Sequence, residues 1–239
     1  MPSPSEDIEK IFTSIGGEFK QSAEGLAIKL GKLRAFILDW DGVFNDGKKT
    51  NNEGSPFTEV DSMGLNMLRF SFYLKHGFVP AIFIVTGENN LPAIQLSKRE
   101  HFNGVYIKMK NKTLALHHIN TNFGLKNDET GFVYDDILDL GLAEAVSLRF
   151  YIKRASNPLL NDYVDKNELA EYFTGNSGRN YAVREISELC IGLLGNYEEV
   201  VQQRVEFSSA YQTYLSLRNN LDTQYFTLQG DRITEYSLP

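Results

Sequence analysis

Short apolar runs alternate along this chain with longer segments in which apolar residues recur every three or four positions. Apolar runs of about four to eight residues predict strands buried on both faces, and the periodic segments predict helices. Strands that alternate with helices indicate βαβ units, and therefore a Rossmann-like α/β fold with helices on both faces of a parallel sheet. The predicted strands are residues 34–38, 79–85, 104–107, 131–134 and 148–152.

Glycine marks the end or the interruption of two predicted helical segments. Residues 61–76 carry apolar side chains at helical spacing and stop at Gly77, which we expect to be the C-cap. Residues 7–33 have the same spacing, with a break at Gly16 and Gly17. Further helices are predicted over residues 92–100, over 112–123 and over most of 181–220.

The segment from Gly47 to Val60 is polar and rich in turn residues. It predicts a small β-hairpin flap with Gly54 in the turn. The last residues, from Gln224, alternate weakly, so they form either a strand or a disordered tail. We therefore expect a helical extension at 1–33, one α/β domain at 34–196, and a C-terminal helical extension with a tail at 197–239.

Composition narrows the class of protein. The 239 residues are 42% hydrophobic, which is enough for a core, and the net charge of -7 argues against a nucleic-acid partner. Cys190 is the only cysteine, so no internal disulfide can form and a cytoplasmic location is expected. The sequence predicts neither a signal peptide nor a segment that enters a membrane.

Polar residues follow three of the predicted strands directly. In an open α/β sheet the site lies at the carboxyl ends of the strands, so these residues converge if the strands are neighbours. A lysine begins the helix before the third of them. The residues are Asp39 and Asp41, Thr86 and Gly87, Asp135 and Asp136, and the lysine is Lys112.

Carboxylates gathered in this way repel one another unless a cation neutralises them. Hard oxygen ligands without histidine or cysteine favour Mg²⁺. An ionised aspartate beside Mg²⁺ can attack phosphorus and form an aspartyl-phosphate, and a second aspartate two residues later can protonate the leaving oxygen. The sequence therefore predicts phosphoryl chemistry, with Thr86, the Gly87 amide and Lys112 holding the phosphoryl oxygens.

The order of these motifs resembles that of the haloacid dehalogenase superfamily. Within the superfamily, the chain is most similar to the capless, tetrameric 3-deoxy-D-manno-octulosonate 8-phosphate (KDO 8-phosphate) phosphatases. The similar segments are Asp39-Trp-Asp-Gly-Val-Phe-Asn-Asp-Gly47, Phe57 to Gly64, Tyr106 to Lys112, Tyr134-Asp-Asp-Ile-Leu-Asp139, and Gly175 to Gly178 with Ala182-Val-Arg-Glu185.

The resemblance implies a role for each motif residue and no large cap domain. It also implies a homotetramer in which the hairpin and the segment from Gly175 to Gly178 serve assembly and substrate enclosure. By the same resemblance, Asp39 is the nucleophile and a Mg²⁺ ligand, Asp41 is the acid/base and offers its backbone carbonyl to the metal, Thr86 and Lys112 bind phosphate, Asp135 is a further metal ligand, and Asp136 and Asp139 lie beside the ligands.

Substrate recognition departs from that family. Its members usually carry arginine at the positions of Val60 and Glu88, so two positive charges that would meet an anionic sugar acid are missing here. We therefore expect a related phosphorylated sugar or sugar acid as substrate. The cations that could compensate are Lys98, Arg99, Lys108 and Lys110.

Three other functions fit parts of the pattern. A phosphatase for another nonulosonate or sugar phosphate would use the same machinery. A catalytically weak relative could serve as an oligomeric binding module, although carboxylates retained at Asp39, Asp41 and Asp135 are costly without a metal. A receiver domain also places acidic residues and a lysine beside Mg²⁺, but the spacing of Asp39 and Asp41 disfavours it.

Overall fold

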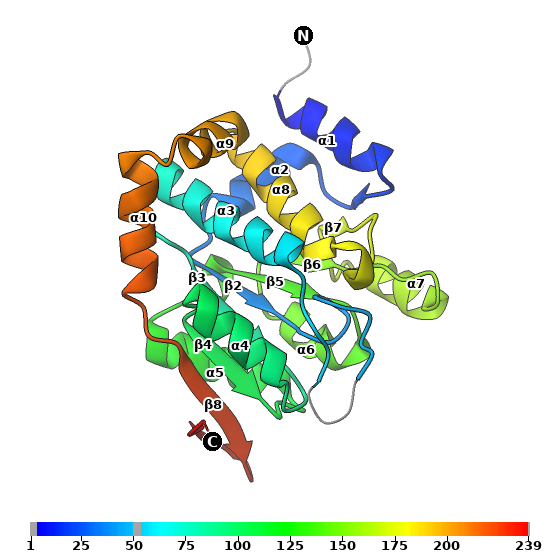
Figure 1. Cartoon of the computed structure of the whole chain (residues 1–239). Helices are drawn as coiled ribbons and strands as arrows, with labels where there is room; N and C mark the ends of the chain where they lie inside the picture. The colour runs from blue at the N-terminus through cyan, green and yellow to red at the C-terminus, as the bar shows by residue number, and fades with distance from the viewer. Residues whose placement is uncertain (1–3, 50–53, 239) are drawn as a thin grey trace.

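One mixed sheet runs through the whole protein (Figure 1). The computed structural model describes residues 4–49 and 54–238. The sheet order is β1-β7-β6-β5-β2-β3-β4-β8-β9, parallel from β7 to β8 and antiparallel at both edges. The strands are β1 (Glu18–Phe19), β2 (Ala35–Leu38), β3 (Ala81–Val85), β4 (Gly104–Ile107), β5 (Thr130–Tyr134), β6 (Leu148–Tyr151), β7 (Tyr172–Phe173), β8 (Gln224–Gln229) and β9 (Arg232–Glu235).

Helices cover both faces of the sheet, as the alternation of apolar runs and periodic segments predicts. On β2, Phe36 and Leu38 face one core while Ala35 and Ile37 face the other. The helices over the first core are α1 (Pro4–Ser14), α2 (Ala23–Leu30), α3 (Glu59–His76), α4 (Leu91–Glu100), α8 (Ala182–Leu194), α9 (Tyr197–Val205) and α10 (Ser209–Asn219). Those over the second are α5 (Lys112–Phe123), α6 (Leu140–Ala143) and α7 (Pro158–Lys166).

The predicted helix ends are largely confirmed. Gly77 ends α3 with a φ of 75°, and its N–H donates to the carbonyl of Tyr73. At the other end, α3 begins at Glu59, two residues earlier than predicted, because the Thr58 hydroxyl accepts from the Asp61 N–H as an N-cap. No helix among the described residues has the length and apolar content needed to cross a bilayer.

Both terminal extensions join the central fold. Figure 1 shows α1 and α2 beside α8, and the C-terminal strand β8 extends the sheet by pairing with β4. Of the two possibilities for the residues after Gln224, a strand is therefore correct. The short strands β1 and β7 and the helix α7 were not predicted.

The tip of the predicted β-hairpin, residues 50–53, lies outside the described residues. Among its described flanks, residues 47–49 and 55–58 belong to no helix or strand. Gly54 makes an isolated bridge and has a φ of 82°, which suits a glycine in a turn.

Candidate metal and phosphate site

The carboxyl ends of β2, β3 and β5 lie side by side. Strand β2 pairs in parallel with both neighbours, so that Leu38 lies opposite Ile84 on β3 and Val133 on β5. The Asp39 N–H continues the ladder by donating to the Val133 carbonyl at 3.0 Å. The residues that follow the three strands therefore meet at one edge of the sheet, as the sequence predicts.

Three buried carboxylates form the centre of this edge. Asp39, Asp135 and Asp139 each offer an oxygen, and these oxygens lie within 4.8 Å of one another. Burial and the Asp139 charge raise the pKa of Asp39 to about 7, although Lys112 opposes the shift. Burial and the Asp39 charge raise the pKa of Asp135 to about 8. Burial and mutual repulsion therefore disfavour ionisation of these carboxyls, and a bound cation would relieve both.

Lys112 supplies one of the positive charges. Its ammonium lies 2.5 Å from Asp39 Oδ1 and 2.5 Å from Asp139 Oδ1, and its side chain is almost fully buried. Burial lowers the pKa of Lys112, but the two carboxylates outweigh burial and raise it overall. Asn111 caps α5 by accepting from the Thr113 N–H, which fixes Lys112 as the first residue of the helix.

Asp41 points to a different set of partners. Its carboxylate accepts from the Ser55 hydroxyl at 2.7 Å and from the Asn90 amide at 2.9 Å. The same amide lies 2.8 Å from the hydroxyl of Thr86, which links Asp41 to the predicted phosphate-binding residue. The Asp41 side chain does not belong to the group of three carboxylates, and the predicted metal contact of its backbone carbonyl stays a prediction.

Asp136 and Asp139 have separate positions in the turn after β5. The Asp136 carboxylate accepts from the Ile137 N–H at 2.7 Å and is exposed. The Asp139 carboxylate is buried, accepts from the Asp136 N–H at 3.2 Å, and belongs to the group of three. Asp139 thus holds both the turn and Lys112.

Arg154 is a member of the site that sequence reasoning missed. Its Nη2 lies 2.5 Å from Asp135 Oδ2, while the buried Asp135 Oδ1 has no hydrogen-bond partner within the described residues. Arg154 follows the carboxyl end of β6, so the rule that located the aspartates also covers it. A Cβ on Gly42, whose φ is 91°, would lie 1.7 Å from Arg154 Nη2, so only glycine leaves room for this ion pair.

The glycine-rich segment before α8 packs against the first motif of the same chain. A Cβ on Gly178 would lie 2.2 Å from the carbonyl oxygen of Gly42 and 2.4 Å from that of Asn45. The Asn45 side chain accepts from the Gly42 N–H at 3.1 Å and from the Gly47 N–H at 2.8 Å, which fixes the loop. The predicted role of this segment in assembly stays a prediction.

A cavity of about 390 Å³ opens onto the carboxylates. Of the lysines and arginines considered as compensating charges, Lys110 lines it, whereas Arg99 is bound to Glu59 and Glu100. Lys49 is an additional cation in the lining, 3.8 Å from Glu88. Gly87 and Asp41 also face this cavity, beside Asp39 and Lys112.

Comparison with known proteins gives structural matches. No protein-family model matches the chain, and no curated protein matches it by sequence. A Legionella pneumophila protein assigned to subfamily III A of the haloacid dehalogenase hydrolases has a TM-score of 0.62 and 26% identity, covering 76% of this chain and 94% of that one. The chain has the haloacid dehalogenase fold. The predicted resemblance is therefore confirmed at the level of the fold.

Two metal-bound structures share this haloacid dehalogenase fold. KDO 8-phosphate phosphatase from Moraxella catarrhalis, in complex with magnesium, phosphate and KDO, has a TM-score of 0.63 and 21% identity over 75% of this chain and 98% of that chain. The cobalt-bound KDO 8-phosphate phosphatase from Haemophilus influenzae has a TM-score of 0.58 and 19% identity, over 70% and 92%.

The residues present fit a divalent cation. Three buried carboxylates supply hard oxygen donors, and the buried Oδ1 of Asp135 lacks any other partner within the described part of the chain. Histidine and cysteine are absent from the group, so it does not resemble a zinc site. The haloacid dehalogenase fold and this donor set together support a metal-dependent hydrolase.

Proposed function

We propose that the chain is a Mg²⁺-dependent phosphomonoesterase that hydrolyses a small phosphorylated sugar or sugar acid. The observation that carries the proposal is the position of Asp39, held at 2.5 Å by Lys112 within a group of three buried carboxylates at the carboxyl ends of the strands. The structures that share the fold include KDO 8-phosphate phosphatases, which supports this substrate class.

Asp39 is the nucleophile in this proposal. Its carboxylate oxygen forms a bond to phosphorus while the bond from phosphorus to the leaving oxygen breaks, which gives an aspartyl-phosphate. Lys112, Thr86 and the Gly87 amide hold the phosphoryl oxygens as their charge shifts. Mg²⁺, held by Asp39, Asp135 and the Asp41 backbone carbonyl with Asp136 and Asp139 nearby, would supply electrostatic stabilisation of the phosphoryl group.

Asp41 is the acid and then the base. It gives its proton to the leaving alkoxide, and it takes a proton from the water that attacks the aspartyl-phosphate, so that inorganic phosphate leaves and Asp39 is restored. Its hydrogen bonds from Ser55 and Asn90 hold the carboxylate in place for both transfers. Asn90 also orders Thr86, so one side chain aligns the proton donor with the phosphate-binding hydroxyl.

We also propose that the protein is a homo-oligomer, by resemblance a tetramer in the cytoplasm. Ile137 and Leu138 are 66% and 64% exposed, and Leu138 lines the cavity. A second copy that covers these side chains would bury apolar area and close the cavity. Light scattering coupled to gel filtration measures the oligomer number, and a monomer at micromolar concentration would contradict this assembly.

Phosphate release from a panel of sugar phosphates tests the proposed activity. We expect turnover by the unmodified protein with Mg²⁺ and none with a chelator. Asp39→Asn should abolish turnover, whereas Asp231→Asn, a matched change in the distant turn before β9, should not alter it. A folded, Mg²⁺-binding protein that hydrolyses no member of the panel would refute the phosphatase and favour a binding module.

A further inference from the structure

Arg154 brings a second fixed positive charge to the carboxylate group, opposite Lys112. When all three are ionised, as they would be beside a bound cation, Asp39, Asp135 and Asp139 carry three negative charges, and Lys112 and Arg154 carry two positive charges in direct contact with them. The group is thus left with one net negative charge. Asp41 and the exposed Asp136 add more negative charge around it.

The ion pair between Arg154 and Asp135 occupies space that is open only because residue 42 is glycine. Gly42 has a left-handed φ of 91°, and a Cβ there would lie 1.7 Å from Arg154 Nη2 and 2.2 Å from Asp135 Oδ2. Asp135 Oδ2 is occupied by the guanidinium, whereas Asp135 Oδ1 has no hydrogen-bond partner within the described residues. The carboxylate therefore presents one oxygen to Arg154 and the other to a prospective cation.

Arg154 also borders a second cavity. The residue lines a separate cavity of about 470 Å³ that the Gly175–Gly178 segment also borders. Within residues 4–49 and 54–238, Asp135 is the one ion-pair partner of Arg154, and its side chain is 26% exposed. The guanidinium is therefore partly open to this second cavity and not enclosed with the three carboxylates.

Charge balance then distinguishes the site with Arg154 from the site without it. With a divalent cation bound, the group is one charge more positive with Arg154 than without it, and this charge favours a phosphate dianion. Without Arg154 the same metal-loaded group would carry one positive charge fewer and would attract the dianion less strongly. The guanidinium also repels the cation, so its presence lowers affinity for the metal.

We propose that Arg154 is a positioning residue that weakens metal binding and strengthens phosphate binding at this site. It holds Asp135 Oδ2 and makes the metal-loaded group one charge more positive than it would be without the guanidinium. The proposal concerns the binding of the two ions and does not require turnover, so it can hold even where the proposed phosphatase activity fails. A merely structural role for Arg154 would not produce opposite changes in the two affinities.

Isothermal titration calorimetry of two probes tests this division of roles. In Arg154→Gln, which removes the charge but keeps an N–H donor, we expect Mg²⁺ to bind about tenfold more tightly or better. Inorganic phosphate should bind the Mg²⁺-saturated variant about tenfold more weakly, because a charge-assisted contact is lost. Arg154→Lys should restore both affinities toward those of the unmodified protein.

Arg179→Gln is the matched control, since Arg179 lines the same cavity without touching Asp135. It should leave the affinity for Mg²⁺ unchanged. Weaker or unchanged Mg²⁺ binding in a folded Arg154→Gln protein would overturn the proposal, as would unchanged phosphate binding. Circular dichroism and a melting curve establish that each variant is folded.

Discussion

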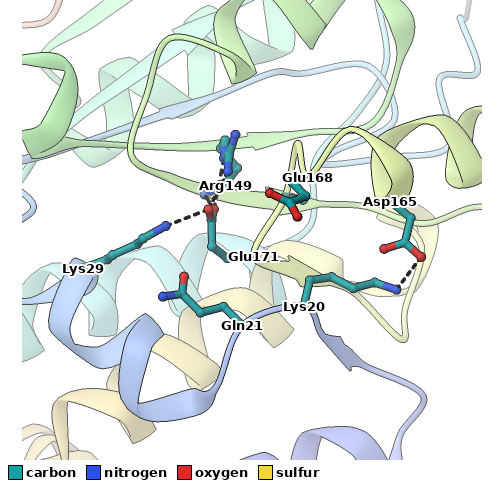
Figure 2. A pocket seen from close by; sticks show the side chains of 8 residues that line it. Lys20, Gln21, Lys29, Arg149, Asp165, Glu168 and Glu171 are labelled. Carbon is teal, nitrogen blue, oxygen red and sulfur yellow. Dashed lines mark hydrogen bonds and ion pairs between the residues drawn. The ribbon is translucent and has the colours of Figure 1, made fainter.

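Two clusters of buried charge lie at opposite ends of the parallel strands, one at the amino ends and one at the carboxyl ends. They differ in how completely their charges are paired. At the amino ends of β6 and β7, Glu171 lies between Arg149 and Lys29, as Figure 2 shows. The Glu171 carboxylate accepts from Arg149 Nη2 at 2.6 Å and from Lys29 Nζ at 2.8 Å. At the carboxyl ends, three carboxylates share two cations.

The pKa shifts follow that difference in pairing. Burial alone would raise the pKa of Glu171, but Arg149 and Lys29 outweigh burial and lower it. Burial and neighbouring carboxylates instead raise the pKa of Asp39 to about 7 and that of Asp135 to about 8. Paired charge thus stabilises the fold, whereas surplus buried charge of one sign marks a place where a ligand of the opposite sign binds.

The Glu171 cluster is expected to be structural. Its residues line a cavity of about 420 Å³. In the same lining, Lys20 pairs with Asp165 at 3.1 Å (Figure 2). These pairs tie α2 and the β1 region to β6, β7 and α7. Variants in the Glu171 cluster should therefore change the stability of the fold, whereas variants in the carboxylate group should change metal binding and turnover.

Loss of the proposed nucleophile is expected to have the largest effect. Asp39→Asn should lower kcat by about 10³-fold or more, because no aspartyl-phosphate can form. Steady-state phosphate release measures this loss. The matched change Glu171→Gln should leave kcat within about threefold of that of the unmodified protein, measured below the variant's melting temperature. A comparable loss of kcat in both variants would contradict the difference in role between the two clusters.

Loss of the buried carboxylate in the paired cluster should instead reduce stability. Glu171→Gln leaves Arg149 and Lys29 without their shared partner, so the free energy of unfolding should fall by about 3 kcal/mol. Urea unfolding followed by circular dichroism measures the change. Asp165→Asn removes a half-exposed partner of Lys20 and should cost less than about 1 kcal/mol of unfolding free energy. A larger loss of stability there than in Glu171→Gln would contradict the structural role of Glu171.

The smallest expected effect is the pH dependence of the Glu171 contribution. Because the folded pKa of Glu171 lies below its ordinary value of 4.5, its stabilisation is complete above pH 4.5 and is lost as pH falls through the folded pKa. The stability difference between the unmodified protein and Glu171→Gln should therefore shrink from pH 6 to pH 4, by about 1 kcal/mol or less. Parallel urea curves at the two pH values measure it; a difference that grows toward pH 4 would have the wrong sign.

Much of the fold could be predicted from the local sequence pattern, because apolar runs indicate buried strands and periodic segments with capping residues indicate helices. Helix α5 spans Lys112–Phe123 as predicted, and the polar residues that follow β2, β3 and β5 meet because these strands are neighbours. Strands β1 and β7 have two residues each, too few for any period. Helix α7 has nine residues, and its apolar pattern is limited to one short stripe that includes Leu160 and Val164, which is too brief to stand out in the sequence.

The sequence named candidate residues for the site, but it did not predict which of their side chains would contact one another. Asp139 enters the carboxylate group because a turn after β5 brings it back, and Asp41 turns toward Ser55 and Asn90. The pairing of Arg154 with Asp135 depends on the register of β5 and β6 and on the room left by Gly42. Tertiary packing decides such contacts, and single-sequence patterns do not encode it.

Calorimetric titration with Mg²⁺ tests most directly whether surplus buried charge marks the site. The account predicts one Mg²⁺ bound per chain, binding abolished by Asp135→Asn, and binding retained in Asp165→Asn from the paired cluster. Saturation with Mg²⁺ at about 100 times its dissociation constant should add about 2.7 kcal/mol to the unfolding free energy of the unmodified protein. Mg²⁺ binding that survives Asp135→Asn, or that is absent from the folded unmodified protein, would contradict the account.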